Sequence, residues 1–307
     1  MGMPRWHGLR VVAADASKMQ LFLQDVTKRC MHEMIAFALY LPGLEMTLAA
    51  TLYSPHVGER KMLFDHLDTL DARDLLVLDR GYPASWLIAC LIQRSIHFCM
   101  RVDASGFAAV KRFLQSGLAE QIVSLNAPDR DDCETYGCKR IPLQVRLVRV
   151  VTPNGRVHVV MTALLDSVAY PAAGFLDLYH SRWRIEEAFK RLKHRLALEN
   201  TSGLSLLAAE QDFAAKILAD NLNALTVNEA VEQNNIPDNY KINRTYSYAH
   251  LKRCLPRWIL QALPETDQLF STLAELAKNL IRSLPGVSKP RPNHPKPHRK
   301  HAYKSTT

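Results

Sequence analysis

The stretches Val11-Val12-Ala13-Ala14-Asp15 and Leu75-Leu76-Val77-Leu78-Asp79 share one form, an apolar run that ends at an aspartate. Short apolar runs of this kind predict strands buried on both faces. Two neighbouring strands of this kind would bring their final carboxylates close together at one edge of a sheet. Paired carboxylates are hard oxygen ligands, which Mg²⁺ takes when it also binds a phosphate. Each aspartate alone is equally compatible with a turn or helix cap.

The surrounding sequence predicts a mixed α/β sheet flanked by helices. Leu41-Pro42-Gly43-Leu44 joins two strand-like runs in a hairpin pattern. The later strands alternate with helices, which is typical of a mixed sheet. The predicted order is strand, strand, strand, helix, strand, helix, strand, over residues 9–14, 34–40, 45–53, 58–70, 75–78, 83–93 and 97–102.

The middle of the chain reads as rich in β-structure. Pro153-Asn154-Gly155 separates two apolar runs and is a strong hairpin turn. The polar residues 127–140 predict a loop. The chain beyond Tyr170 has helical patterning almost to Leu284. The predicted strands of the middle segment cover residues 121–125, 143–151 and 156–165.

A predicted helix over residues 173–198 carries a polar face beside an apolar one. Tyr179, Arg182, Glu186 and Lys193 follow each other at spacings of three, four and seven residues. At helical geometry these four side chains fall within an arc of roughly 60°. An apolar stripe that could dock the helix lies next to them. A solvated amphipathic helix with salt bridges explains the same pattern without any chemistry.

The string from Tyr179 to Lys193 resembles the Tyr-Arg-Glu-Lys signature of insertion-sequence DDE transposases. All four positions of the spacing Y-x2-R-x3-E-x6-K are met. Asp79-Arg80-Gly81-Tyr82 resembles the surroundings of the second aspartate of that family, and Asp15 matches the first. The resemblance extends over roughly residues 9–284.

The resemblance implies an RNase H-like core that holds two Mg²⁺ ions, with Mn²⁺ as a substitute. Asp15, Asp79 and Glu186 would be the catalytic metal ligands. The ions would activate a water or a DNA 3′-hydroxyl and stabilise the leaving oxygen. Residues that would contact DNA are Tyr179, Arg182 and Lys193, which bind phosphates, and Trp183, which either stacks on a flipped base or belongs to the core.

We therefore predict a transposase catalytic domain that cuts DNA at transposon ends and joins it to a target. The predicted partners are DNA and a second copy of the chain at paired ends. Only 14 residues precede Asp15, whereas the family usually places an end-recognition region there. A shortened inhibitor of a full-length transposase and a stand-alone RNase H-like nuclease are the alternatives. The predicted parts are 1–103 and 169–284 as the two core segments, the second with C-terminal helices, 104–168 as a β-rich insertion, and 285–307 as a tail.

The net charge of +9 is concentrated in the tail. Residues 281–307 contain seven Lys or Arg residues and no acid, so the rest of the chain carries about +2. The five prolines from Pro285 onward predict disorder, and the charge predicts nonspecific DNA affinity. The most apolar long run, 34–53, is interrupted by Pro42, Gly43 and Glu45 and is too broken for a membrane span. We expect a cytoplasmic protein.

Overall fold

The computed structural model describes residues 4–24, 29–152, 154–260 and 266–282. The predicted tail, residues 285–307, lies outside the described residues. The chain forms two compact units. We call Met3–Gln20 with His32–Arg191 the sheet unit, and Leu21–Met31 with Leu192–Thr307, together with the first two residues, the helical unit. None of the described helices combines the length and apolar composition needed to cross a membrane.

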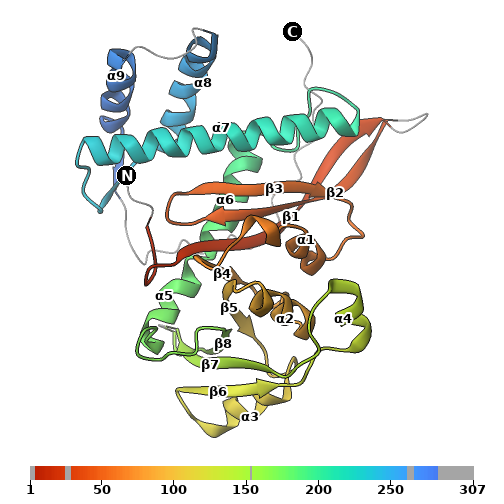
Figure 1. Ribbon diagram of the computed structural model, residues 1–307. Helices are drawn as coiled ribbons and strands as arrows, with labels where there is room; N and C mark the ends of the chain where they lie inside the picture. The colour runs from red at the N-terminus through yellow and green to blue at the C-terminus, as the bar shows by residue number, and fades with distance from the viewer. Residues whose placement is uncertain (1–3, 25–28, 153, 261–265, 283–307) are drawn as a thin grey trace. The chain divides into compact units, whose positions relative to one another are not determined.

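An eight-stranded sheet organises the sheet unit (Figure 1). Its order is β3-β2-β1-β4-β5-β8-β7-β6. Strands β1, β4 and β5 are parallel, whereas β3 is antiparallel to β2, and β8, β7 and β6 continue the sheet in antiparallel fashion. The strands are β1 Arg10–Gln24, β2 Arg29–Leu41, β3 Met46–Tyr53, β4 Asp74–Leu78, β5 His97–Val102, β6 Glu120–Leu125, β7 Leu143–Val151 and β8 Val157–Thr162.

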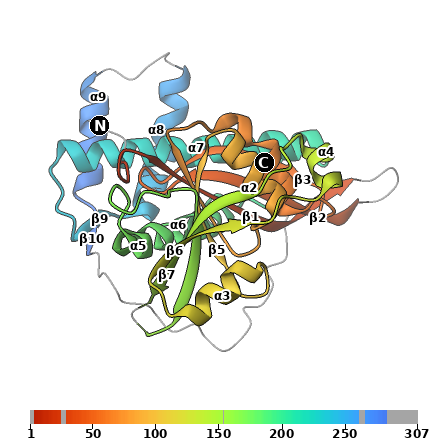
Figure 2. The ribbon, with the colours of Figure 1, turned by 60° about the horizontal axis from the view of Figure 1, so that its bottom comes forward.

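The order β3-β2-β1-β4-β5 is that of an RNase H-like core, which confirms the predicted fold class. The strands β6 to β8, from the segment predicted as an insertion, extend this same sheet beyond β5 (Figure 2). That residues 104–168 form an insertion between the two core segments stays a prediction.

Helices cover both faces of the sheet. One apolar core lies under α1 Glu59–Asp65, α2 Ser85–Gln93 and α3 Ala108–Ser116. It contains Val12, Leu76 and Leu78 from the central strands. The opposite core, which contains Leu75 and Val77, lies under α5 Phe175–His180. Alternate residues of β4 therefore face opposite helices, as a strand buried on both sides requires.

Three predicted boundaries differ from the structure. Strand β1 runs nine residues past Asp15, because Met19, Leu21 and Leu23 alternate with more exposed residues and extend the β-structure. Residues 127–140 are not a loop throughout: they contain α4 Arg130–Tyr136, whose Tyr136 ring stacks on Trp86 at 3.7 Å. The predicted helix over 58–70 is α1 followed by a 3₁₀ turn at Leu67–Thr69.

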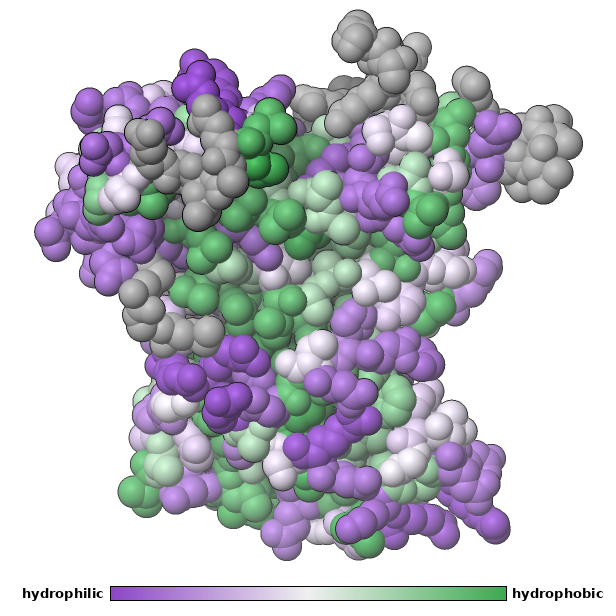
Figure 3. Space-filling view, turned by 45° about the horizontal axis from the view of Figure 1, so that its top comes forward, coloured by the Kyte–Doolittle hydropathy of each residue, from purple (hydrophilic) through white to green (hydrophobic). Residues whose placement is uncertain are grey.

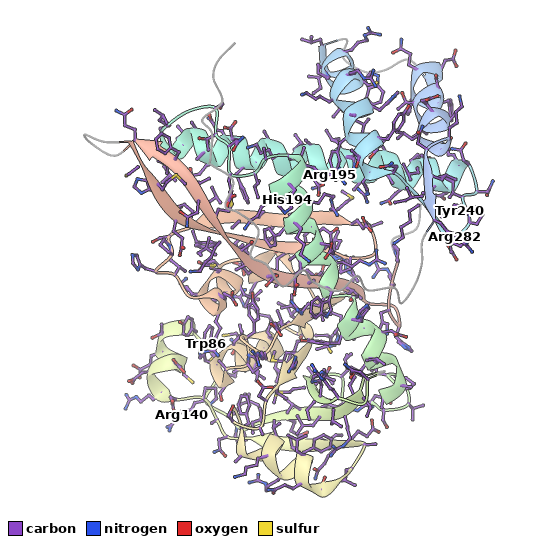
Figure 4. The ribbon with its side chains drawn as sticks, turned by 180° about the vertical axis from the view of Figure 1, so that it is seen from behind. Trp86, Arg140, His194, Arg195, Tyr240 and Arg282 are labelled. Carbon is purple, nitrogen blue, oxygen red and sulfur yellow. The ribbon has the colours of Figure 1, made fainter. Side chains whose placement is uncertain are left out.

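The helical unit is built around α7 Leu206–Gln233. It also contains α8 Arg244–Leu260 and α9 Thr266–Ala277, and a small apolar core that includes Val227 and Leu273. The sequence did not predict its two-stranded sheet, in which β9 Tyr240–Ile242 pairs with β10 Leu280–Arg282. Tyr240 and Arg282 lie side by side there (Figure 4).

Candidate active site

The register of the two central strands brings Asp15 and Asp79 together. Strands β1 and β4 pair in parallel, and the last paired residues are Ala13 and Val77. Continued by two residues, the same register sets Asp15 opposite Asp79 and points both side chains toward the face that carries α5. Neighbouring strands lie about 4.8 Å apart. The predicted adjacency of the two strands is confirmed.

The polar face of the predicted helix lies on two helices instead of one. Helix α5 ends at His180, α6 spans Trp183–Arg195, and a tight turn at Ser181 and Arg182 joins them. In this turn the Arg182 amide donates to the Tyr179 carbonyl at 3.2 Å, and the Ser181 hydroxyl donates to the Leu178 carbonyl at 2.6 Å. Bonds over three residues replace the α-helical pattern and interrupt the helix.

Both helices reach the strand ends. The Tyr179 hydroxyl donates a hydrogen bond to Asp79 Oδ1 at 3.1 Å. The Arg182 guanidinium is buried and donates from Nη2 to Glu186 Oε1 at 2.8 Å. Asp79 and Glu186 are each half-buried. The structure therefore brings four of the predicted residues into one site, and Asp15 joins them through the strand register.

The charges in this site act on one another. Burial raises the pKa of Asp15 to about 7, the Arg182 guanidinium opposes this rise, and the carboxylates of Glu186 and Glu59 add to it. Burial lowers the pKa of Arg182, but Asp79, Glu186 and Asp15 raise it and the net shift is upward. One buried guanidinium thus supplies the positive charge among several carboxylates.

Glu59 is a site residue that sequence reasoning missed. It is the first residue of α1, and its carboxylate lies against Gly81: a Cβ built on that glycine would be 3.5 Å from Glu59 Oε2. Burial raises the pKa of Glu59, and Asp79 raises it further. A single acid in the first turn of a helix is common, because it interacts well with the helix dipole. Its sequence context therefore gave no functional signal.

A cleft of about 520 Å³ opens beside the carboxylates. It is lined by Asp79, Glu186, Tyr179, Arg182 and Trp183. The other cleft residues that carry or can carry positive charge are Arg80, Arg101, His158 and His180. None of these four was predicted as a site residue. They come from β5, β8, α5 and the loop after β4, and only the fold gathers them.

Arg80 and Arg101 share one acidic partner. Asp103 is 3.7 Å from Arg80 and 3.9 Å from Arg101. The Nε of Arg101 is buried without a hydrogen-bond partner. Burial lowers the pKa of His158, and the positive charges of Arg101 and Arg156 lower it further. The cleft therefore combines carboxylates on one side with guanidinium groups on the other, which suits a phosphate bound next to metal ions.

Trp183 and Lys193 also lie on α6. The Trp183 side chain is 44% exposed and lines the cleft, and the Arg182 Cζ atom is 5.5 Å from its ring. Trp183 is therefore not a core residue. Lys193 follows Glu186 by about two helical turns, in the part of α6 that belongs to the helical unit, where burial lowers its pKa and Glu199 opposes the shift. The next residues, His194 and Arg195, end the helix (Figure 4). The predicted DNA contacts stay predictions.

The donor atoms fit a hard divalent cation. The carboxylates of Asp15, Asp79, Glu186 and Glu59 act on one another electrostatically, and oxygen is the ligand that Mg²⁺ prefers. Two polar atoms there, the Tyr82 hydroxyl and the Arg182 Nε, are buried without a partner. Within the described residues, however, no three His, Cys, Asp or Glu side chains are gathered tightly enough to hold an ion as they stand.

A family comparison agrees with this geometry. The model of the transposase DDE domain matches residues 6–222, more than half of the chain. The chain belongs to the DDE transposase family. Its matched range contains Asp15, Asp79 and Glu186. Transposases of this family generally use divalent metal ions. The narrower Tyr-Arg-Glu-Lys signature stays a prediction.

One solved structure similar to this DDE transposase is a cryo-EM structure of the piggyBac transposase synaptic complex with hairpin DNA. The TM-score is 0.48 and the sequence identity is 10%. The match covers 91% of this chain and 59% of that one, so the chain spans less than two thirds of that transposase. No curated protein matches this chain.

Proposed function

We propose that this chain cuts DNA at transposon ends and joins the released strands to target DNA, with Asp15, Asp79 and Glu186 as the ligands of two Mg²⁺ ions. The proposal rests above all on the strand register, which sets Asp15 opposite Asp79 beside the helices that carry Tyr179 and Glu186. Bound ions would supply the positive charge that offsets the transferring phosphoryl group. Mn²⁺ should substitute for Mg²⁺.

The remaining groups of the cleft would position DNA. Arg182 is buried and directed at the carboxylates, so it is placed to contact the phosphate next to the cut. Arg80 and Arg101 are more exposed and line the same cleft, where they would bind flanking phosphates. Tyr179 would hold the Asp79 carboxylate in place. Trp183, exposed at the cleft, would stack on an unpaired base.

The proposal is tested by cleavage of a supercoiled plasmid in the presence of Mg²⁺, with EDTA as the control. The wild-type chain should nick the plasmid and, with a pre-cut 3′-hydroxyl end, join that end to the plasmid. Asp79→Asn and Glu186→Gln should each lower cleavage by more than about 100-fold, because each removes a charged ligand but keeps its size. Their DNA binding should stay close to that of the wild type.

Glu187→Gln is a matched control. Glu187 is the exposed neighbour of Glu186 on α6 and pairs with Lys190. Its replacement should leave cleavage unchanged. Cleavage by Glu186→Gln at the wild-type rate would refute the proposed site. Nicking without strand joining would favour a nuclease, and DNA binding with no cleavage by any variant would favour an inhibitor of a full-length transposase. A homodimer at paired DNA ends is part of the proposal.

A further inference from the structure

The N-terminus of α1 is fastened to the loop that follows Asp79. Arg60 Nε donates to the carbonyls of Gly81 at 3.0 Å and Tyr82 at 3.2 Å. The Tyr82 amide in turn donates to the Asp79 carbonyl at 3.2 Å. These bonds fix the position of Glu59, the residue before Arg60, relative to the end of β4. The Glu59 carboxylate lies against Gly81 as a result.

Tyr82 carries a buried hydroxyl on which these carboxylates act electrostatically. The side chain is fully buried, and its hydroxyl has no hydrogen-bond partner. The charges that act on it are those of Glu59, Asp15 and Asp79, with Arg182 opposing them. Buried hydroxyls are nearly always hydrogen-bonded, and an unpaired one costs about 1–3 kcal/mol. A donor left unpaired beside several acceptors indicates that one of these carboxylates occupies another position when the site is filled.

Glu59 does not behave as an ordinary acid of a first helical turn. The residue is exposed as a whole, yet its carboxylate end lies beside Gly81, where burial and the charge of Asp79 raise its pKa and Arg182 and Arg60 oppose the rise. Glu59 instead adds a fourth negative charge to Asp15, Asp79 and Glu186.

We propose that Glu59 is a fourth carboxylate ligand of the divalent-metal site, shared with Asp79, and that the Tyr82 hydroxyl positions it by donating a hydrogen bond. This inference rests on the proposed function. Arg182 is then released from Glu186 and becomes available to a DNA phosphate. Tyr82 is a positioning residue, since it acts on the metal through Glu59.

The test measures Mn²⁺ binding to the full chain without DNA, with electron paramagnetic resonance as the readout. The wild type should bind two ions. Glu59→Gln should lower the affinity for one of them by about tenfold or more, because a neutral amide is a poor ligand for a hard cation. Asp79→Asn should weaken both. Glu187→Gln, an exposed acid on α6, should bind Mn²⁺ as the wild type does.

Tyr82→Phe provides a second, independent variant. It removes a hydroxyl that has no partner, so the apparent melting temperature in EDTA should not fall. The Mn²⁺ affinity should nevertheless drop several-fold, because Glu59 loses its donor. This combination separates positioning from a general loss of structure, and it also covers the case in which Glu59→Gln does not fold.

Wild-type Mn²⁺ affinity in Glu59→Gln, with binding lost in Asp79→Asn, would overturn this inference and leave the proposed function intact. Wild-type affinity in Asp79→Asn, or no Mn²⁺ binding by the wild type, would overturn both. Unchanged Mn²⁺ affinity in Tyr82→Phe would show that Tyr82 does not position Glu59.

Discussion

The sheet unit and the helical unit bury different kinds of residue. All five residues of β4 are buried, and Leu75, Leu76, Val77 and Leu78 have no exposed surface. In the helical unit, α7 buries Lys216, Asp220 and Asn223 beside small apolar residues. The same helix exposes Leu218 and Leu225, and apolar residues also reach the surface drawn in Figure 3. The sheet unit has two large apolar clusters, whereas the helical unit has a small one beside the buried polar groups of α7.

This difference explains why the candidate catalytic carboxylates lie in the sheet unit. Asp15 lies within β1 and Asp79 directly follows β4, so both carboxylates are held by the rigid frame of the sheet.

Asp74→Ala should destabilise the sheet unit by about 3–5 kcal/mol. Asp74 is fully buried and accepts hydrogen bonds from the Arg10 guanidinium, one of them at 2.7 Å, and from the Asp71 amide at 2.9 Å. Its loss leaves these donors partly buried and unpaired. Urea unfolding measures the effect. The exposed Arg130–Glu134 pair is the control, because Glu134→Ala should cost less than about 1 kcal/mol.

Arg182→Ala should lower cleavage by about 100-fold and weaken DNA binding as well, because it removes the phosphate contact next to the cut. Glu186→Gln should lower cleavage alone. Parallel cleavage and DNA-binding assays separate the two variants. If Arg182→Ala bound DNA as tightly as the wild type, the guanidinium would have a role only among the carboxylates.

Lys216→Met should destabilise the helical unit by about 1–3 kcal/mol. The Lys216 ammonium donates to the carbonyls of Ala197 at 2.9 Å and Leu198 at 3.5 Å, and also to that of Asn200. Faster hydrogen exchange in residues 197–216 would report the loss. Mn²⁺ binding should remain unchanged, and a parallel loss of Mn²⁺ binding would show that the two units do not act separately.

Leu218→Ser should change stability by no more than about 0.5 kcal/mol, because 59% of the leucine side chain is already exposed. Val227→Ser, at a buried position of the same helix, is the contrasting variant and should cost several times more. Thermal unfolding of both variants measures the difference. A large loss for Leu218→Ser would mean that this position is covered in solution.

The central strands could be predicted because the apolar pattern of a single strand is contained in one short stretch of sequence. An uninterrupted apolar run that ends at an aspartate predicts a buried strand wherever it occurs, and β1 and β4 both have this form. The periodicity of residues 173–198 likewise predicted which side chains share a face. It could not show the turn at Ser181 and Arg182, because bonds over three residues leave no mark on the apolar pattern.

Other features depend on contacts between distant segments. Helix α4 has a polar sequence and is held by the stack of Tyr136 on Trp86. The strands β9 and β10 are three residues each, too short for an alternating pattern. Glu59, Arg80 and Arg101 resemble ordinary surface charges in the sequence, and only tertiary folding brings them to the strand ends. The positions of charged residues in a sequence show no periodicity that would indicate such a tertiary contact.

We infer that Asp15, within β1, and Asp79, at the end of β4, form a metal site together with Glu186 of α6. The most direct test is the anomalous scattering of Mn²⁺ in a crystal of the full chain. The account predicts two peaks about 4 Å apart, bonded by Asp15, Asp79 and Glu186, with Arg182 turned away from Glu186. Mn²⁺ bound elsewhere, or no peak at the strand ends while Arg182 stays bonded to Glu186, would contradict it.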